Sequence, residues 1–145
     1  KTAYEIPKRD WSSDVCSSDL GLPGSGKTTF AKKLVENKKI PHFNADDVRK
    51  LFEDWDFTDV GRRRQANRMM AMCDLAVNHV VVDFVCPFES YRKFYDITVW
   101  MNTLDKGRYE DTNKIFEKPK RCTFEIKNYI YDEIIKEIHG RIKNI

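Results

Sequence analysis

The segment GLPGSGKT, at residues 21–28, constrains the fold of this 145-residue chain more than any other feature. It fits the pattern G-x-x-x-x-G-K-[ST], whose glycines let backbone N–H groups surround phosphate oxygens at the N-terminus of a helix. In this pattern Lys27 reaches the β- and γ-phosphates of a nucleotide, and the hydroxyl of Thr28 is a ligand of Mg²⁺. The sequence therefore predicts a site for ATP or GTP with Mg²⁺. The expected nucleotide-binding residues are Gly21, Pro23, Gly24, Ser25, Gly26, Lys27, Thr28 and Thr29.

The rest of the chain alternates between strand and helix patterns. Short apolar runs predict strands at residues 40–44, 80–86, 96–101 and 122–126. Helical periodicity predicts helices at residues 26–37, 46–53, 62–77 and 130–142. Strands that alternate with helices favour a parallel sheet that is covered on both faces. We therefore expect an α/β fold of the P-loop NTPase type, with helices on both faces of a parallel sheet.

The residues before the phosphate loop do not resemble the strand that such a loop normally follows. A buried parallel strand is rich in Val, Ile and Leu, whereas residues 11–20 read WSSDVCSSDL. This stretch resembles the translation of one reading frame of a widely used sequencing adapter. We therefore interpret residues 1–20 as a non-native leader, with the first strand degraded or replaced. A genuine leader rich in Ser and Asp is the alternative.

Composition excludes several classes of protein. The net charge of +3 is too small to indicate a nucleic-acid partner, and no apolar run approaches the roughly 20 residues that cross a bilayer. The four cysteines stand far apart with no C-x-x-C pair, which argues against a disulfide framework and a zinc site and favours a reducing cytoplasm. His42, His79 and His139 show no metal-ligand spacing. We expect a cytoplasmic protein without nucleic-acid or membrane partners, and leave open whether it forms a homodimer.

Carboxylates lie where parallel strands are expected to end, beside a nucleotide crevice. Asp46 and Asp47 follow the strand expected over residues 40–44, and Asp83 ends the apolar run VVVD. Asp46 is the better candidate for holding Mg²⁺ or accepting a proton from an acceptor hydroxyl, and Asp47 for capping the next helix. Asp83 resembles a carboxylate that assists Mg²⁺, and a hydrogen-bonded structural role is an equal alternative. We predict Thr28, Asp46 and Asp83 as metal-binding residues, and Lys27 and Asp46 as catalytic residues.

Arginines are concentrated in the helix expected over residues 62–77. Arg62, Arg63, Arg64 and Arg68 place four like charges close together, which is costly unless anions or acids neutralise them. Beside a phosphate loop, a solvated basic face and a second anion-binding site explain this run equally well. We predict Arg62 and Arg68 as the anion-binding residues, because at this spacing they can lie on roughly one side of a helix.

Several motifs, in order along the chain, resemble those of the adenylylsulfate kinases, from residue 21 to about residue 119. After the phosphate loop, NADDVR is similar to the family's D-G-D-N-V-R, and FTDVGRRRQANR is similar to F-S-x-x-D-R-x-x-N-I-R-R. CPFESYR is similar to S-P-F-R-x-x-R, DKGRYED to a lid sequence D-x-K-G-L-Y, and FEKP to Y-E-x-P. Members of this family phosphorylate the ribose 3′-hydroxyl of adenylylsulfate with Mg-ATP.

The resemblance implies that residues 21–145 are a P-loop kinase domain that acts on a small-molecule nucleotide in sulfate assimilation. It places Asp46 on the family's second Asp and Phe57 on the residue that stacks the adenine of the acceptor. It places Arg62 on an arginine that binds the acceptor's anionic end. The substrate-binding residues that it implies are Arg49, Phe57, Arg62, Gln65, Cys86, Pro87 and Lys106.

The chain departs from the family pattern mainly on the acceptor side. Asn44 replaces the first Asp of D-G-D, Gly61 replaces an Asp, and Cys86 replaces the Ser of S-P-F. The segment between VWMN and FEKP is several residues short. ATP use is compatible with all of these changes, whereas the acceptor stays open among adenylylsulfate, a nucleoside and a sugar. A nucleotide-binding module without transfer activity is the remaining alternative.

Overall fold

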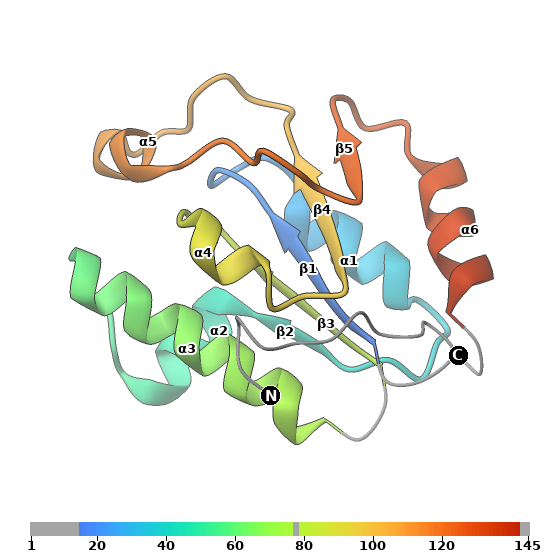
Figure 1. The fold of residues 1–145 in the computed structure, drawn as a ribbon, viewed down its shortest axis with the longest axis horizontal. Helices are drawn as coiled ribbons and strands as arrows, with labels where there is room; N and C mark the ends of the chain where they lie inside the picture. Colours follow the sequence, from blue (N-terminus) through green and yellow to red (C-terminus); the bar gives the residue numbers. More distant parts are fainter. Residues whose placement is uncertain (1–14, 77–78, 143–145) are drawn as a thin grey trace.

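The computed structural model describes residues 15–76 and 79–142, which form one parallel sheet with helices around it (Figure 1). The strands are β1 (Cys16–Leu20), β2 (His42–Asn44), β3 (Val80–Phe84), β4 (Ile97–Met101) and β5 (Phe124–Ile126). They lie in the order β2–β3–β1–β4–β5, and each neighbouring pair is parallel. This sheet confirms the predicted α/β fold of the P-loop type. Residues 1–14 of the expected leader, and residue 77 at the end of an expected helix, lie outside the described residues.

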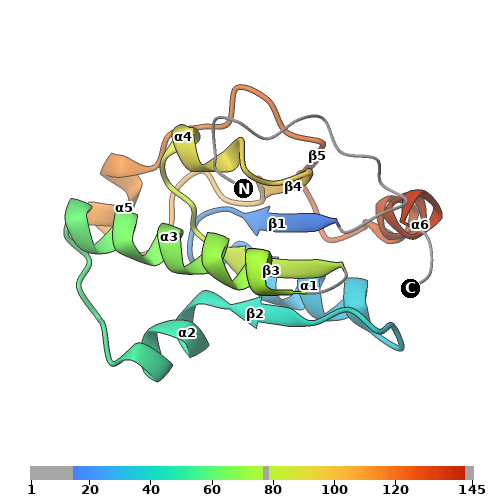
Figure 2. The same ribbon diagram turned by 60° about the horizontal axis from the view of Figure 1, so that its bottom comes forward.

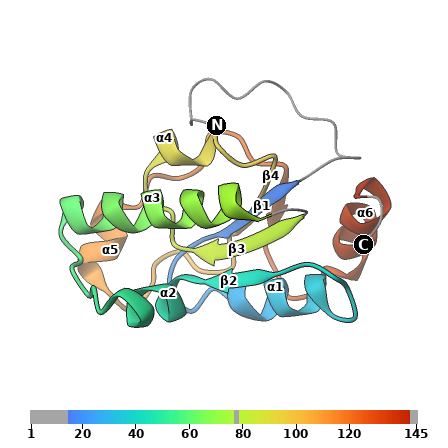
Figure 3. The ribbon, with the colours of Figure 1, turned by 90° about the horizontal axis from the view of Figure 1, so that it is seen from below.

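Helices connect the strands and cover both faces of the sheet (Figures 2 and 3). They are α1 (Lys27–Val35), α2 (Ala45–Phe52), α3 (Asp59–Leu75), α4 (Glu89–Arg92), α5 (Glu110–Ile115) and α6 (Asp132–Arg141). The two helices α1 and α6 pack on one face, and α3 packs on the other. Within the described ranges, no helix has the length and apolar character needed to cross a bilayer.

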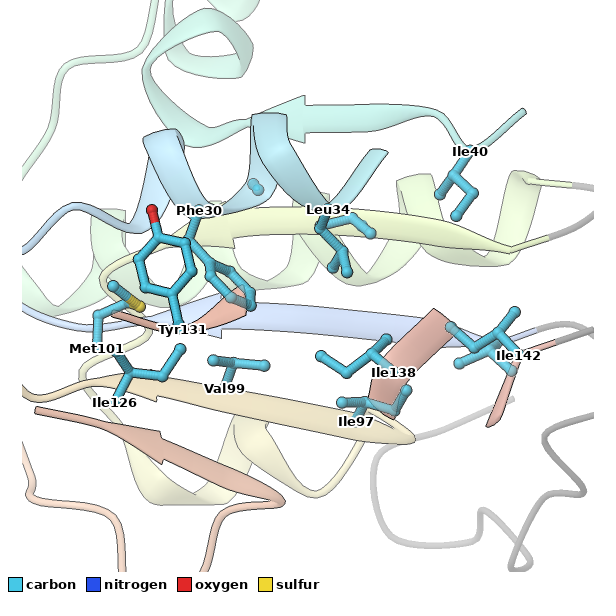
Figure 4. Close-up of a cluster of buried hydrophobic side chains, with 13 residues drawn as sticks. Phe30, Leu34, Ile40, Ile97, Val99, Met101, Ile126, Tyr131, Ile138 and Ile142 are labelled. Atoms are coloured by element: carbon cyan, nitrogen blue, oxygen red, sulfur yellow. The ribbon is translucent and has the colours of Figure 1, made fainter. Parts of the chain in front are cut away.

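Alternation along the strands sends side chains into two separate cores. On one face Val99 of β4 meets Leu34 of α1 and Ile138 of α6 (Figure 4). On the other face Val82 of β3 packs with Met69 of α3. Each of these five side chains is at most 1% exposed. Burial on both faces fixes the strands, and therefore fixes their carboxyl ends, where the candidate site lies.

Strand β1 lies at the centre of the sheet although its sequence is CSSDL. Its backbone pairs with β3 on one side and β4 on the other, so main-chain hydrogen bonds hold it in place. Its side chains are poorly matched to the core. Within the described residues, the hydroxyls of Ser17 and Ser18 and both carboxylate oxygens of Asp19 have no hydrogen-bond partner, and all three residues are at most 1% exposed. Polar residues thus stand where the first apolar strand was expected.

The start of α2 is capped by a residue other than those expected. The side chain of Asn44 accepts a hydrogen bond from the backbone N–H of Asp47 (3.1 Å). Asp46 and Asp47 lie in the first turn of the helix, where their negative charges interact favourably with its dipole. The capping role considered for Asp47 therefore belongs to Asn44.

Candidate active site

The phosphate loop runs from the end of β1 to the start of α1. Gly24 and Gly26 have φ angles of 84° and 95°, in the left-handed region that favours glycine. At Gly26 a Cβ atom would lie 2.8 Å from the ring of Tyr129, so a side chain would also lack room there. Helix α1 begins directly afterwards at Lys27, which brings its free N–H groups to the loop. This geometry is the one that the motif predicts for phosphate binding.

Lys27 turns back toward the loop that precedes it. Its Nζ donates to the backbone oxygen of Leu22 (3.4 Å), and the residue lines a cavity. Burial lowers the pKa of Lys27, while the charges of Asp83 and Asp46 raise it and that of Arg108 lowers it further. The hydrogen bond from Lys27 to the oxygen of Leu22 is long and therefore weak, so Lys27 can exchange it for stronger hydrogen bonds to phosphate oxygens.

Asp83, near the end of β3, is the centre of a hydrogen-bonded network beside the phosphate loop. Its carboxylate is 1% exposed, and its Oδ1 accepts from Oγ1 of Thr28 (2.9 Å) and Nδ2 of Asn44 (3.0 Å). Its Oδ2 contacts Nε2 of His42, and the amide of Asn44 also donates to Oγ1 of Thr28 (3.1 Å). Because Asn44 and Asp83 are register partners on β2 and β3, the sheet itself aligns this network with the first turn of α1.

The oxygen atoms of this network suit Mg²⁺. Magnesium in nucleotide sites is commonly held by one or two carboxylates or a hydroxyl, with phosphates and water completing its shell. The three expected metal ligands, Thr28, Asp46 and Asp83, all line the same cavity. Across residues 15–76 and 79–142, no group of three or more His, Cys, Asp and Glu side chains is arranged to hold a metal ion. A metal here would therefore take the rest of its ligands from a nucleotide and water.

The cavity has a volume of about 720 Å³, which is in the range of small-molecule sites. We call the part lined by Pro23, Gly24, Lys27, Thr28 and Asp83 its nucleotide half. We call the part lined by Trp55, Phe57, Arg62, Tyr109, Asp111 and Thr112 its acceptor half. Since both belong to one cavity, a ligand on the phosphate loop and a second ligand can meet there.

Arg62 is the expected acceptor residue that the structure places most clearly in the cavity wall. It is 7% exposed, and its Nε donates to the backbone oxygen of Phe57 (2.7 Å). One terminal nitrogen donates to Oδ2 of Asp111 (3.0 Å) and Oγ1 of Thr112 (3.3 Å). The guanidinium also lies 5.3 Å from the centre of the Phe57 ring. Arg62, which was expected to bind an anion of the acceptor, is thus already hydrogen-bonded to the carboxylate of Asp111.

The expected residues divide between those in the cavity wall and those behind it. Arg49, Gln65, Cys86, Pro87 and Lys106 do not line the cavity, and neither do Gly21, Ser25, Gly26 and Thr29 of the loop. Arg49 supports Phe57 from behind, with its guanidinium 4.3 Å from the ring centre. Gln65 and Cys86 are buried and hydrogen-bonded within the protein, whereas Lys106 is exposed. Burial raises the pKa of the Cys86 thiol to about 12, so this thiol stays protonated at neutral pH.

Acidic residues neutralise two other arginines of α3, Arg64 and Arg68. Arg64 and Arg68 both bind the carboxylate of Asp54, at 2.7 Å and 2.6 Å. Hydrogen bonds from Arg64 and Arg68 hold the pKa of Asp54 well below its usual range. Arg68, the second residue expected to bind an anion, therefore lies in an internal ion-pair cluster and not in the cavity wall.

Sequence reasoning did not assign His42, Asn44, Trp55, Arg108 or Tyr109 to the site. Asn44 was visible as the residue that replaces a family Asp, but its amide contacts depend on strand register. His42 has no ligand spacing because its partner, Asp83, lies on a neighbouring strand. Trp55 comes from a segment without a regular pattern. Arg108 and Tyr109 belong to the stretch that resembles the lid sequence, but that resemblance did not assign them to the cavity wall.

Comparison with known proteins identifies the family. A family model described as an AAA domain matches residues 20–102, which is more than half of the chain. The chain belongs to this family of AAA domains. The matched range holds the phosphate loop, Asp46 and Asp83, and it ends before the segment that contributes Tyr109 and Asp111 to the cavity.

The curated proteins similar to this chain include adenylate kinases. The adenylate kinase of Rickettsia rickettsii, in the strains Sheila Smith and Iowa, is 28% identical over 126 residues. The match covers 84% of this chain and 56% of the relative, so the chain spans about half the length of these curated relatives.

Solved structures of small kinases share the fold of the AAA domain. The APS kinase CysC of Mycobacterium tuberculosis, solved with AMPPNP and APS, is 18% identical with a TM-score of 0.70, over 87% of this chain and 95% of that one. A gluconokinase from Sinorhizobium meliloti 1021 is 18% identical with a TM-score of 0.61, over 91% and 92% of the two chains. At this level of identity the likeness shows a shared fold, that of small P-loop kinases.

Proposed function

We propose that this AAA domain is a kinase that transfers the γ-phosphoryl group of Mg-ATP to a hydroxyl group of a small molecule. The observation that carries the proposal is the Asp83 network, which joins the first turn of α1 to β2 and β3 in the wall of a cavity. That cavity continues into an acceptor half with aromatic and charged side chains. A site for a nucleotide alone would not need this second half.

Phosphoryl transfer depends on charge neutralisation and alignment more than on covalent chemistry by the protein. Lys27 and the N–H groups of the loop would bind the β- and γ-phosphates. Thr28 and Asp83 would hold Mg²⁺, which neutralises phosphate charge when bound. Asp46, exposed in the first turn of α2 and lining the cavity, would accept the proton of the attacking hydroxyl or complete the metal site.

Adenylylsulfate is the first acceptor candidate, because the motifs of the chain resemble those of its kinases. The ring of Phe57, half exposed in the acceptor half, would stack the adenine, and Arg62 would bind the anionic end. Transfer to this acceptor would place the protein in sulfate assimilation.

An uncharged nucleoside or sugar is the second acceptor candidate, and one contact favours it. Arg62 is already bonded to the carboxylate of Asp111. A neutral acceptor would leave this ion pair intact, whereas an anionic acceptor has to displace Asp111 or share Arg62 with it.

An acceptor screen tests the proposed function. The chain is incubated with Mg²⁺ and ATP labelled at the γ-phosphate, together with adenylylsulfate, AMP, nucleosides or sugars, and the label and ADP are followed. We expect ADP release that depends on one class of acceptor and is lost in Lys27→Ala. The exposed Lys32, on the same helix, gives the matched control Lys32→Ala. ATP binding without transfer to any acceptor would instead favour a nucleotide-binding module.

A further inference from the structure

We infer that Asp111 selects the charge of the acceptor, because its carboxylate occupies Arg62 and competes with any acceptor that brings an anion to that arginine. The inference rests on the proposed function, since it concerns the acceptor half of the same cavity. It predicts that the unmodified protein prefers an acceptor that is uncharged at this point and carries several hydroxyl groups, such as a nucleoside or a sugar.

The ion pair joins a fixed cation to a movable anion. Arg62 is 7% exposed and is held by the backbone oxygen of Phe57 as well as by the hydroxyl of Thr112. The side chain of Asp111 is 68% exposed, and a single hydrogen bond of 3.0 Å joins one of its oxygens to Arg62. An anionic ligand would therefore meet an arginine that cannot move away and a carboxylate that can.

The backbone at Asp111, in α5, is positioned by contacts between α5 and the short segment that leads to it from β4, while the exposed side chain stays free to move. The side chain of Asn113, in α5, binds the backbone of Gly107 in this segment twice, accepting from its N–H (2.8 Å) and donating to its oxygen (2.9 Å). These two hydrogen bonds hold the segment against α5. Tyr109 and Asp111, which follow Gly107, line the cavity. Asp111 thus lines the cavity as part of an ordered wall.

The charges of the cavity wall leave Arg62 as the cation of the acceptor half. Among the residues that line the cavity, the cations are Lys27, Arg62 and Arg108. Arg108 lies over the phosphate loop, since one of its terminal nitrogens is 3.4 Å from the place where a Cβ of Gly24 would be. Lys27 and Arg108 therefore serve the nucleotide half, and the remaining cation is neutralised by Asp111.

The other walls of the acceptor half suit a flat molecule that carries hydroxyl groups. The rings of Trp55, Phe57 and Tyr109 are each about half exposed and line this half. Aromatic faces bind the flat faces of nucleobases and the C–H faces of sugars without requiring a charge. The carboxylates of Asp46 and Asp111 can accept hydrogen bonds from hydroxyl groups. Both features favour a neutral ligand over an anionic one.

Equilibrium binding of adenosine and AMP tests this inference without ATP and without turnover. The two probes share a base and a ribose, and only AMP carries a phosphate. Both dissociation constants are measured at fixed ionic strength for the parent chain, for Asp111→Asn and for Glu110→Gln. The Glu110→Gln variant removes the same charge from the neighbouring exposed position, which does not line the cavity.

We expect Asp111→Asn to tighten AMP binding about 3- to 5-fold, the upper end of the scale of an exposed ion pair, while adenosine binding changes less than about 1.5-fold. Glu110→Gln should change neither, and adding Arg62→Gln to Asp111→Asn should cancel the gain. Melting curves confirm that each variant is folded.

Equal AMP affinity in Asp111→Asn and Glu110→Gln, including affinity too weak to measure in both, would overturn the inference. So would an equal gain for adenosine. Absence of phosphoryl transfer would count against the proposed function alone, because binding is measured separately.

Discussion

The nucleotide half and the acceptor half of the cavity are built in different ways. The nucleotide half comes from one contiguous motif, residues 21–28, and from Asp83, which strand register aligns with it. The acceptor half comes from two segments far apart in the sequence, residues 55–62 and 109–112, which meet through the bond between Arg62 and Asp111. The first half therefore follows from local sequence and sheet geometry. The second depends on side-chain contacts between loops, where one substitution can change the ligand.

The nucleotide half also depends on β1, whose three central residues, Ser17, Ser18 and Asp19, are polar. Asp19 of β1 and Asp83 of β3 are register partners, and both are buried. Asp83 has three hydrogen-bonding partners, whereas Asp19 has none within the described residues. This contrast is what we expect if residues 1–20 are a non-native leader that replaces the first strand, which stays a prediction. Backbone pairing with β3 and β4 holds β1 in the sheet, whereas the unpartnered polar side chains of β1 lower the stability of the fold.

The largest expected effect is on the nucleotide half. Lys27→Ala removes the cation that balances the β- and γ-phosphates, and we expect kcat/KM to fall about 1000-fold with little change in melting temperature. Steady-state kinetics with the best acceptor of the screen measure this, with Lys32→Ala as the control. Turnover at the parent rate would mean that residues 21–28 do not bind ATP.

The next effect separates the two halves. Arg62→Ala should lower kcat/KM for an anionic acceptor such as adenylylsulfate about 10- to 1000-fold, because a charge-assisted hydrogen bond to that acceptor and the alignment that it gives are lost. ATP affinity should change little. Arg63→Ala, an exposed neighbour outside the cavity wall, is the control. If Arg62→Ala weakened ATP and acceptor equally, the division into two halves would be wrong.

A smaller effect concerns the strand from which the nucleotide half extends. Asp19→Val replaces a buried carboxylate without partners by an apolar side chain, so we expect the free energy of unfolding to rise by about 1–3 kcal/mol. Urea denaturation followed by circular dichroism gives the value. The same change at the exposed Asp105 should be nearly neutral. A loss of stability in Asp19→Val would show that the carboxylate has a stabilising partner.

The smallest effect is the pH dependence of stability. Burial raises the pKa of Asp19 well above its ordinary value, and the nearby charge of Asp83 raises it further. The carboxyl group of Asp19 therefore keeps its proton in the folded protein at pH values where the unfolded chain, with an Asp pKa of about 3.9, has released it. The stability contributed by this proton is complete below the pKa of the unfolded chain and is lost as the pH rises through the raised pKa of the folded state. Urea midpoints measured across this range should fall less steeply in Asp19→Val than in the parent, and identical slopes would contradict the assignment.

The sequence predicted the nucleotide half better than the acceptor half for physical reasons. A phosphate loop needs glycine conformations and a helix start that a few adjacent residues specify, and the structure has left-handed glycines at Gly24 and Gly26 and a helix that begins at Lys27. The alternating strand and helix patterns were enough to predict a parallel sheet, but they did not predict the order of its strands. Arg49 matched a family motif, yet the structure places it behind Phe57, because side-chain direction depends on tertiary packing. The contact between Asp111 and Arg62 could not be read from the sequence, since the two residues lie on different helices, α5 and α3.

The most direct test of the account is whether the Asp83 network makes ATP binding depend on Mg²⁺. Calorimetric titrations of ATP, with Mg²⁺ and with EDTA, are compared for the parent, for Asp83→Asn and for Asp47→Asn, an exposed residue outside the cavity wall. We predict that Mg²⁺ tightens ATP binding about 10-fold or more in the parent and in Asp47→Asn, and that Asp83→Asn loses most of this gain. No ATP binding in the folded parent, or the same Mg²⁺ gain in Asp83→Asn, would contradict the account.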